Sequence, residues 1–135
     1  MILLDTCVLI DLPRYALDPT ETYGASILSR AELEFGIHAA PTPEAAAQRT
    51  WWLDQLDDRF AWIEFDLACT RSYGTVAAGA RATGARVHGK DALIAAQAHR
   101  HGAAVMTANT DDFHPFDHLV QVLAPTPLQP AETDQ

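Results

Sequence analysis

The sequence has 135 residues, an apolar fraction of 48% and a net charge of −9 at pH 7. This length and composition suit one globular unit with a single hydrophobic core. No apolar run in the sequence approaches the ~20 residues that span a bilayer, and no basic residues precede the first apolar residues as they would in a signal peptide. The sequence has only two cysteines, too few for a disulfide framework. We therefore expect a cytoplasmic protein without membrane contact. The negative charge disfavours a nucleic-acid partner, unless the acids gather divalent cations that reverse the local field.

The chain begins with a uniformly apolar run, ILL, that ends on Asp5. Such a run is typical of a buried strand in a parallel sheet. In chain order, strands are predicted at residues 2–5, 23–28, 60–65, 103–107 and 119–124. Helices are predicted from Thr6 for a short turn, then at 29–40, 42–58, 67–83 and 91–101, with caps at Ser29, Thr42, Asp66 and Asp91.

Strands that alternate with helices predict an α/β fold with a central, mostly parallel five-stranded sheet. We expect one domain over residues 1–124. Residues 125–135 contain three prolines and no periodicity, which predicts a flexible tail.

Acidic residues from four separate segments are predicted to lie at strand ends or helix starts. They are Asp5, Glu32, Asp91 and the turn that contains Asn109, Asp111 and Asp112. In open α/β sheets, ligands bind at the carboxyl ends of the strands, so these groups are expected at one edge. Oxygen ligands without His or Cys suit Mg²⁺ or Mn²⁺ better than zinc.

Each acid also has a simpler explanation. Asp5 and Asp91 can cap helices, Ser29 with Glu32 fits a capping box, and Asn and Asp are common in turns. These explanations account for each residue singly. They do not account for a set of carboxylates that would repel one another if they were gathered without cations.

Four segments resemble PIN-domain proteins, in particular the VapC-type ribonuclease toxins of bacterial toxin–antitoxin pairs. They are LLDTCVLIDL, SRAELEFG, GKDALIAAQAHRHG and VMTANTDDF, and the likeness extends from Met1 to about Ala124. The resemblance implies a PIN-like three-layer α/β/α fold. It also implies a Mg²⁺-dependent endoribonuclease, with Mn²⁺ as an alternative ion, that hydrolyses RNA phosphodiester bonds with a metal-activated water.

The resemblance implies roles for individual residues. Asp5, Glu32, Asp91 and Asp112 are the expected catalytic acids, and Thr6 and Thr107 supply hydroxyls close to them. The metal ligands are expected among Asp5, Glu32, Asp91, Asn109, Asp111 and Asp112, with the choice within the last turn left open. The implied partners are RNA, a second copy of the chain and a cognate VapB-like antitoxin, which would form a hetero-oligomer with the toxin.

RNA binding also needs cations, and Arg81, Arg86 and Lys90 are concentrated in the segment that leads to Asp91. They fit either a phosphate-guiding role or a solvated loop. His88 lies next to the same acidic edge. Two alternatives remain: a haloacid-dehalogenase-like phosphatase, although Cys7 stands where that chemistry needs an acid, and a non-catalytic PIN-like module that binds RNA or protein.

Overall fold

The computed structural model describes residues 1–129 and has a parallel sheet of five strands at its centre. The strands are β1 (Ile2–Leu4), β3 (Tyr23–Ser26), β4 (Trp62–Ile63), β5 (Ala104–Met106) and β6 (Val122–Leu123). Their order across the sheet is β4-β3-β1-β5-β6, and every neighbouring pair is parallel. All five predicted strands and the expected α/β class are therefore confirmed.

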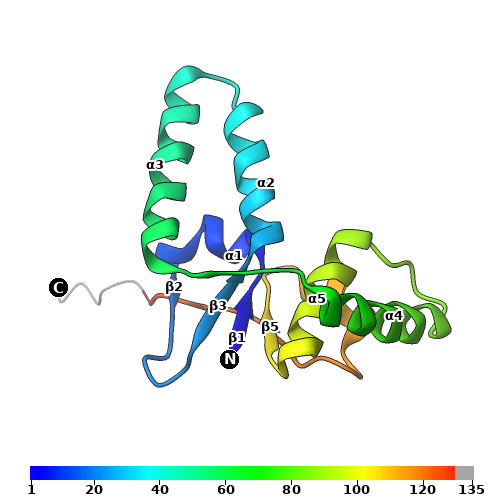
Figure 1. Cartoon of the computed structure of the whole chain (residues 1–135). Coiled ribbons are helices and arrows are strands. Elements are labelled where there is room, and N and C mark those ends of the chain that lie inside the picture. The colour runs from blue at the N-terminus through cyan, green and yellow to red at the C-terminus, as the bar shows by residue number, and fades with distance from the viewer. Residues whose placement is uncertain (130–135) are drawn as a thin grey trace.

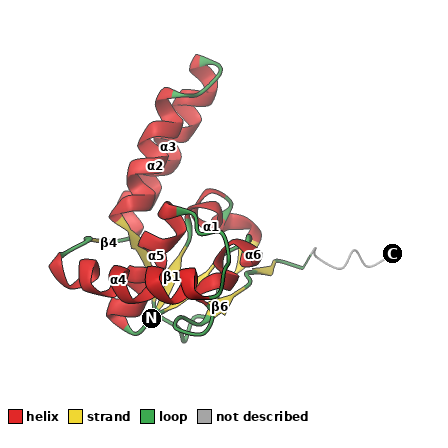
Figure 2. Ribbon diagram, turned by 90° about the vertical axis from the view of Figure 1, so that its right-hand side faces the viewer, coloured by secondary structure: helices red, strands yellow, loops and turns green. Residues whose placement is uncertain are grey.

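The segments that connect the strands form helices. These are α1 (Thr6–Ile10), α2 (Ile27–His38), α3 (Pro43–Arg59), α4 (Leu67–Ala82), α5 (Gly89–His101) and the short α6 (Thr110–Phe113). Two 3₁₀ turns occur at Leu12–Arg14 and His114–Phe116. Helices α2 and α3 form a hairpin that stands away from the sheet, while α4 and α5 lie together on its other side (Figure 1). Figure 2 shows the same projecting hairpin after a quarter turn.

Side chains that alternate along the central strands build two apolar cores. Leu3 and Val105 face one side, where they join Val76 of α4 and Ile94 of α5. Residues at neighbouring positions, such as Leu4, face the other side and pack with residues of α1 and α3. Because apolar side chains on both faces are buried, the strands need no alternation of polar and apolar residues. The uniformly apolar first strand follows from this three-layer arrangement.

The start of α2 differs from the prediction. The helix begins at Ile27, and the cap is Ser26, whose hydroxyl accepts a hydrogen bond from the Leu28 N–H at 3.0 Å. Ser29 is instead fully buried within the helix, where it accepts a 2.9 Å hydrogen bond from the Thr6 hydroxyl. The capping-box explanation of Glu32 is therefore wrong, because the cap lies three residues earlier than that motif requires.

The segment after β6 also differs from the expected loose tail. Thr126–Pro127 form β7, which pairs antiparallel with β2 (Tyr15–Ala16), and the Leu128 N–H donates to the Arg14 carbonyl at 2.9 Å. Residues 126–128 thus add an ordered two-stranded ribbon beside the first loop. The rest of the predicted tail, residues 130–135, lies outside the described residues.

Candidate active site

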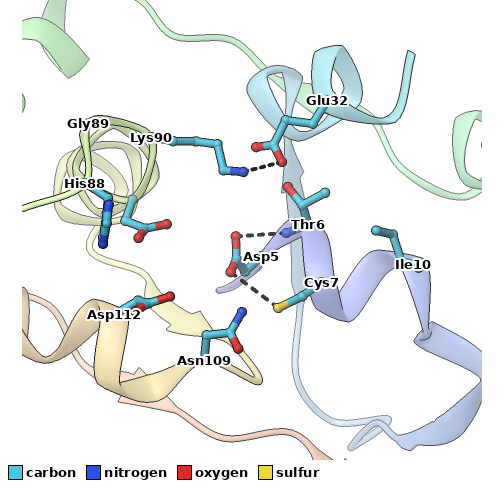
Figure 3. A pocket seen from close by; sticks show the side chains of 11 residues that line it. Asp5, Thr6, Cys7, Ile10, Glu32, His88, Gly89, Lys90, Asn109 and Asp112 are labelled. Atoms are coloured by element: carbon cyan, nitrogen blue, oxygen red, sulfur yellow. Dashed lines mark hydrogen bonds and ion pairs between the residues drawn. The ribbon is translucent and has the colours of Figure 1, made fainter. Parts of the chain in front are cut away.

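A pocket of about 620 Å³ opens at the carboxyl edge of the sheet, where β1 and β5 end. Figure 3 shows its walls converging from α1, α2, α5 and the turn before α6. Most of the expected acids line it. The lining consists of Asp5, Thr6, Cys7, Ile10, Glu32, His88, Gly89, Lys90, Asp91, Asn109 and Asp112.

Asp5 lies at the bottom of this pocket and is nearly buried, with 6% of its surface exposed. One carboxylate oxygen accepts a hydrogen bond from the Thr6 N–H at 2.9 Å, so Asp5 does cap α1. The other oxygen accepts from the Thr107 hydroxyl at 2.9 Å and from the Cys7 thiol at 3.4 Å. The backbone N–H of Asp5 also donates to the Met106 carbonyl at 2.9 Å. The carboxylate is therefore held by residues of α1 and by Thr107, the residue after β5.

Asp91 and Asp112 bring further negative charge to the pocket. Asp91 is in the first turn of α5, two residues after the helix start, and Asp112 is in α6. Burial raises the pKa of Asp91, and the negative charges of Asp5 and Asp112 raise it further. A carboxylate whose neighbours disfavour its ionisation gains when a cation enters among them.

Glu32 comes from the second turn of α2 and meets a cation of its own chain. The Lys90 ammonium lies 2.7 Å from one oxygen of Glu32 across the pocket (Figure 3). The hydrogen bond to Glu32 is the main reason that the pKa of Lys90 is raised. The second oxygen of Glu32 is buried and has no hydrogen-bond partner among the described residues.

The turn after β5 divides its three candidate ligands. Asn109 and Asp112 line the pocket, whereas Asp111 lines a separate hollow with His114 and Asp117. Residue 111 points elsewhere because Thr110–Phe113 form a helical turn, in which consecutive side chains face different directions. The structure thus favours Asn109 and Asp112 as the pocket's groups from this turn.

The two expected hydroxyls both lie beside the acids. Thr107 is fully buried, and its hydroxyl oxygen also accepts a hydrogen bond from the Asn109 N–H at 3.0 Å. Thr107 therefore couples Asp5 to the turn that carries Asn109. Thr6 is anchored to Ser29 of α2, which ties the helix of Glu32 to the end of β1.

The three predicted RNA-binding cations are dispersed. Lys90 is in the pocket, Arg81 lines a smaller hollow of about 320 Å³ with Tyr73 and Val87, and Arg86 is exposed in the loop before α5. The two hollows share Gly89, so the hollow that Arg81 lines adjoins the acidic pocket.

Some pocket residues were not predicted. Cys7 and Ile10 belong to α1, which runs along the pocket's wall, and Gly89 begins α5. Burial raises the pKa of the Cys7 thiol, which favours the uncharged form beside Asp5. Sequence spacing offered a signal for Cys7 and Gly89, since each lies two residues from a predicted acid. Ile10 offered none.

The donor set fits a hard divalent cation in its chemistry. It supplies carboxylates and an amide oxygen, with an orphaned buried oxygen on Glu32 and mutual repulsion among the aspartates. Among residues 1–129, however, the side chains do not already form a group of three His, Cys, Asp or Glu able to hold an ion as they stand. Binding of an ion would therefore require these side chains to draw together.

The chain is thus an α/β protein with a parallel sheet and an acidic pocket at the carboxyl edge of that sheet. A family model described as PIN domain matches residues 2–119. The chain belongs to the PIN-domain family. The expected family is confirmed, and the phosphatase alternative is excluded with it.

Curated relatives and solved structures agree with this assignment. The chain is 34% identical over 113 residues to Ribonuclease VapC4 of Mycobacterium tuberculosis, a match that covers 81% of this chain and 86% of the relative. It is 33% identical over 129 residues to VapC ribonuclease Y4jK of Sinorhizobium fredii, with 84% and 90% covered. The crystal structure of VapBC-5 from Mycobacterium tuberculosis, a member of the VapBC family of toxin–antitoxin systems, is similar with a TM-score of 0.75 and 28% identity. That match covers 92% of this chain and 96% of the other.

No helix within residues 1–129 combines the length and apolar composition needed to cross a bilayer.

Proposed function

We propose that this protein is a metal-dependent endoribonuclease and the toxin of a toxin–antitoxin pair. The observation that carries the proposal is the convergence of Asp5, Asp91 and Asp112 on one pocket in a chain of the PIN-domain family. The two curated relatives named above are ribonucleases, which supports RNA as the substrate class.

Asp5, Asp91 and Asp112 would hold Mg²⁺ or Mn²⁺, with Asn109 and Glu32 completing the set. A bound ion supplies a water of lowered pKa, and it stabilises charge on the phosphate and the leaving oxygen. The chain's own part is positional. Because Asp5 accepts hydrogen bonds from the start of α1 and from Thr107, which directly follows β5, its carboxylate stays fixed while the other acids close around it.

The RNA backbone would approach the pocket past the adjoining hollow that Arg81 lines and the loop that carries Arg86. Arg86 is exposed and pairs with no carboxylate among the described residues, so it is free to meet a phosphate. With so few cations around a chain of net charge −9, RNA binding should be weak at physiological salt and strongly salt-dependent.

A VapB-like antitoxin is the proposed protein partner, as in the VapBC complex described above. A groove of about 440 Å³ between α1, α2 and α3 suits it, because the groove includes Ile10, Leu33 and Trp52. The groove shares Thr6, Ile10 and Glu32 with the acidic pocket. An antitoxin segment with apolar side chains in the groove could therefore place a basic side chain at the acids. A homodimer of the toxin is proposed from the family resemblance alone.

The test is incubation of the purified protein with total bacterial RNA in Mg²⁺, in Mn²⁺ and in excess chelator. Discrete fragments that form only with a divalent ion support the proposal. Intact RNA in every condition, with the protein folded by circular dichroism, contradicts it and leaves the non-catalytic module as the better description.

A further inference from the structure

Among residues 1–129, Glu32 is the one acid of the pocket that forms an ion pair with a cationic side chain. Lys90 reaches it from the first turn of α5 and holds one oxygen at 2.7 Å (Figure 3). The other oxygen of Glu32 is buried without a partner among the described residues. The carboxylate is thus half satisfied, by a single positive charge.

The ion pair is built to be exchangeable. The side chain of Lys90 is 56% exposed and that of Glu32 is 25% exposed, so both groups can reach solvent without disturbing the core. Exposed pairs contribute little net free energy, and the lysine stem is flexible. A divalent cation that also contacts Asp5 and Asp91 offers Glu32 more charge than Lys90 does.

We propose that Lys90 is a built-in competitor for the metal site: it occupies Glu32 in the ion-free protein and must release it before a divalent cation can bind there. This inference rests on the proposed metal dependence of the site. Its consequence is a site that loads only at divalent concentrations high enough to displace Lys90. Lys90 also leaves the Glu32 carboxylate when the ion arrives.

Binding of Mn²⁺, followed by electron paramagnetic resonance without RNA, tests the competition. Lys90→Met should tighten Mn²⁺ binding by about threefold or more, because the pair no longer has to be broken. Lys90→Arg should bind like the wild type. Arg86→Met is the matched control for lost positive charge, since Arg86 lies four residues away without a carboxylate partner among residues 1–129. In a Glu32→Gln background, the gain from Lys90→Met should shrink to that of Arg86→Met.

The release step has a second readout, because Lys90 is the only lysine in the sequence. Reductive methylation with ¹³C-formaldehyde labels Lys90 and the N-terminal amine, and Lys90→Arg identifies which resonance belongs to the lysine. Titration with diamagnetic Mg²⁺ should move the Lys90 resonance towards the position of a free side chain. It should leave the N-terminal resonance in place.

Equal Mn²⁺ affinity of Lys90→Met and Arg86→Met, or a Lys90 resonance that Mg²⁺ does not move while Mg²⁺ binds, overturns the role of Lys90 and leaves the proposed function intact. Absence of divalent binding to all of these proteins overturns both this inference and the metal dependence on which it rests.

Discussion

The hydroxyl of Thr107 donates a 2.9 Å hydrogen bond to Asp5, although 102 positions separate the two residues in the sequence. The pairing of β1 with β5 makes this possible, since Leu4 lies opposite Met106 and the next residue of each strand continues the alignment. Parallel pairing thus converts two distant strand ends into one fixed carboxylate.

Removal of this hydrogen bond should impair the site more than the fold. Thr107→Val keeps the shape of the buried side chain, so we expect unfolding free energy to fall by about 1 kcal/mol. Loss of a side chain that orients a metal ligand should lower divalent affinity and RNA cleavage by about 10- to 100-fold. Chemical denaturation and single-turnover cleavage measure the two effects. Thr75→Val, exposed on α4, is the control; if it and Thr107→Val cleave equally fast, the orienting role is disproved.

RNA cleavage should depend on Asp112 and should not depend on Asp111. Asp112 lines the acidic pocket, while Asp111 faces the neighbouring hollow. Asp112→Asn should reduce cleavage about tenfold or more, because it removes a negative charge that attracts the cation. Asp111→Asn should cleave RNA at nearly the wild-type rate. The reverse order of the two variants in a cleavage time course would show that the turn rearranges when the ion binds.

The projecting hairpin of α2 and α3 should lose stability in acid, because protonation of Asp57 weakens its ion pair with Arg30. This residue of α3 accepts hydrogen bonds from the Arg30 guanidinium of α2 at 2.8 and 2.9 Å and from the Trp62 indole at 2.7 Å. The hydrogen bonds from Arg30 are the main cause that lowers the pKa of Asp57. A lowered pKa in the folded state means that the stabilisation is complete above the unfolded value of about 3.9 and is lost as pH falls through the folded value.

Asp57→Asn should therefore lower the unfolding free energy by about 0.5–1 kcal/mol at pH 7, because the pair is partly solvent-exposed. The difference from wild type should shrink as the pH falls below the unfolded value of about 3.9 and should vanish once Asp57 is protonated in the folded protein. Urea denaturation across this pH range measures it, with the exposed Asp54→Asn of the same helix as control. A difference that stays constant with pH would mean that the Asp57 charge has no part in holding the hairpin.

The five strands could be predicted because each coincides with a short, largely apolar segment. A strand in the middle of a three-layer fold buries such a segment on both faces. Asp5 and Asp91 could be placed at the site for a related reason: strand ends and helix starts meet at one edge of a parallel sheet. Local patterns failed where two residues satisfied the same rule. Ser26 and Ser29 both suit a helix cap, and only the burial of Ser29 against Thr6 decides between them.

Contacts between segments far apart in the chain could not be predicted from local sequence patterns. Lys90 was predicted either to guide RNA phosphates or to lie in a solvated loop, and the ion pair that it forms with Glu32, 58 positions away, was not foreseen. The pairing of Thr126–Pro127 with Tyr15–Ala16 likewise joins two segments that have no strong strand propensity of their own. Such contacts depend on the assembled fold, and composition alone does not encode them.

The central claim is that the carboxylates at the sheet edge hold a divalent ion for RNA hydrolysis. The most direct test compares cleavage of total RNA in Mg²⁺ by the wild type, Asp5→Asn and Asp91→Asn, with the exposed Asp54→Asn as the matched control. We predict discrete fragments from the wild type and the control, and cleavage slower by about 100-fold or more in the two pocket variants. Equal, chelator-resistant cleavage by all four proteins would contradict the account.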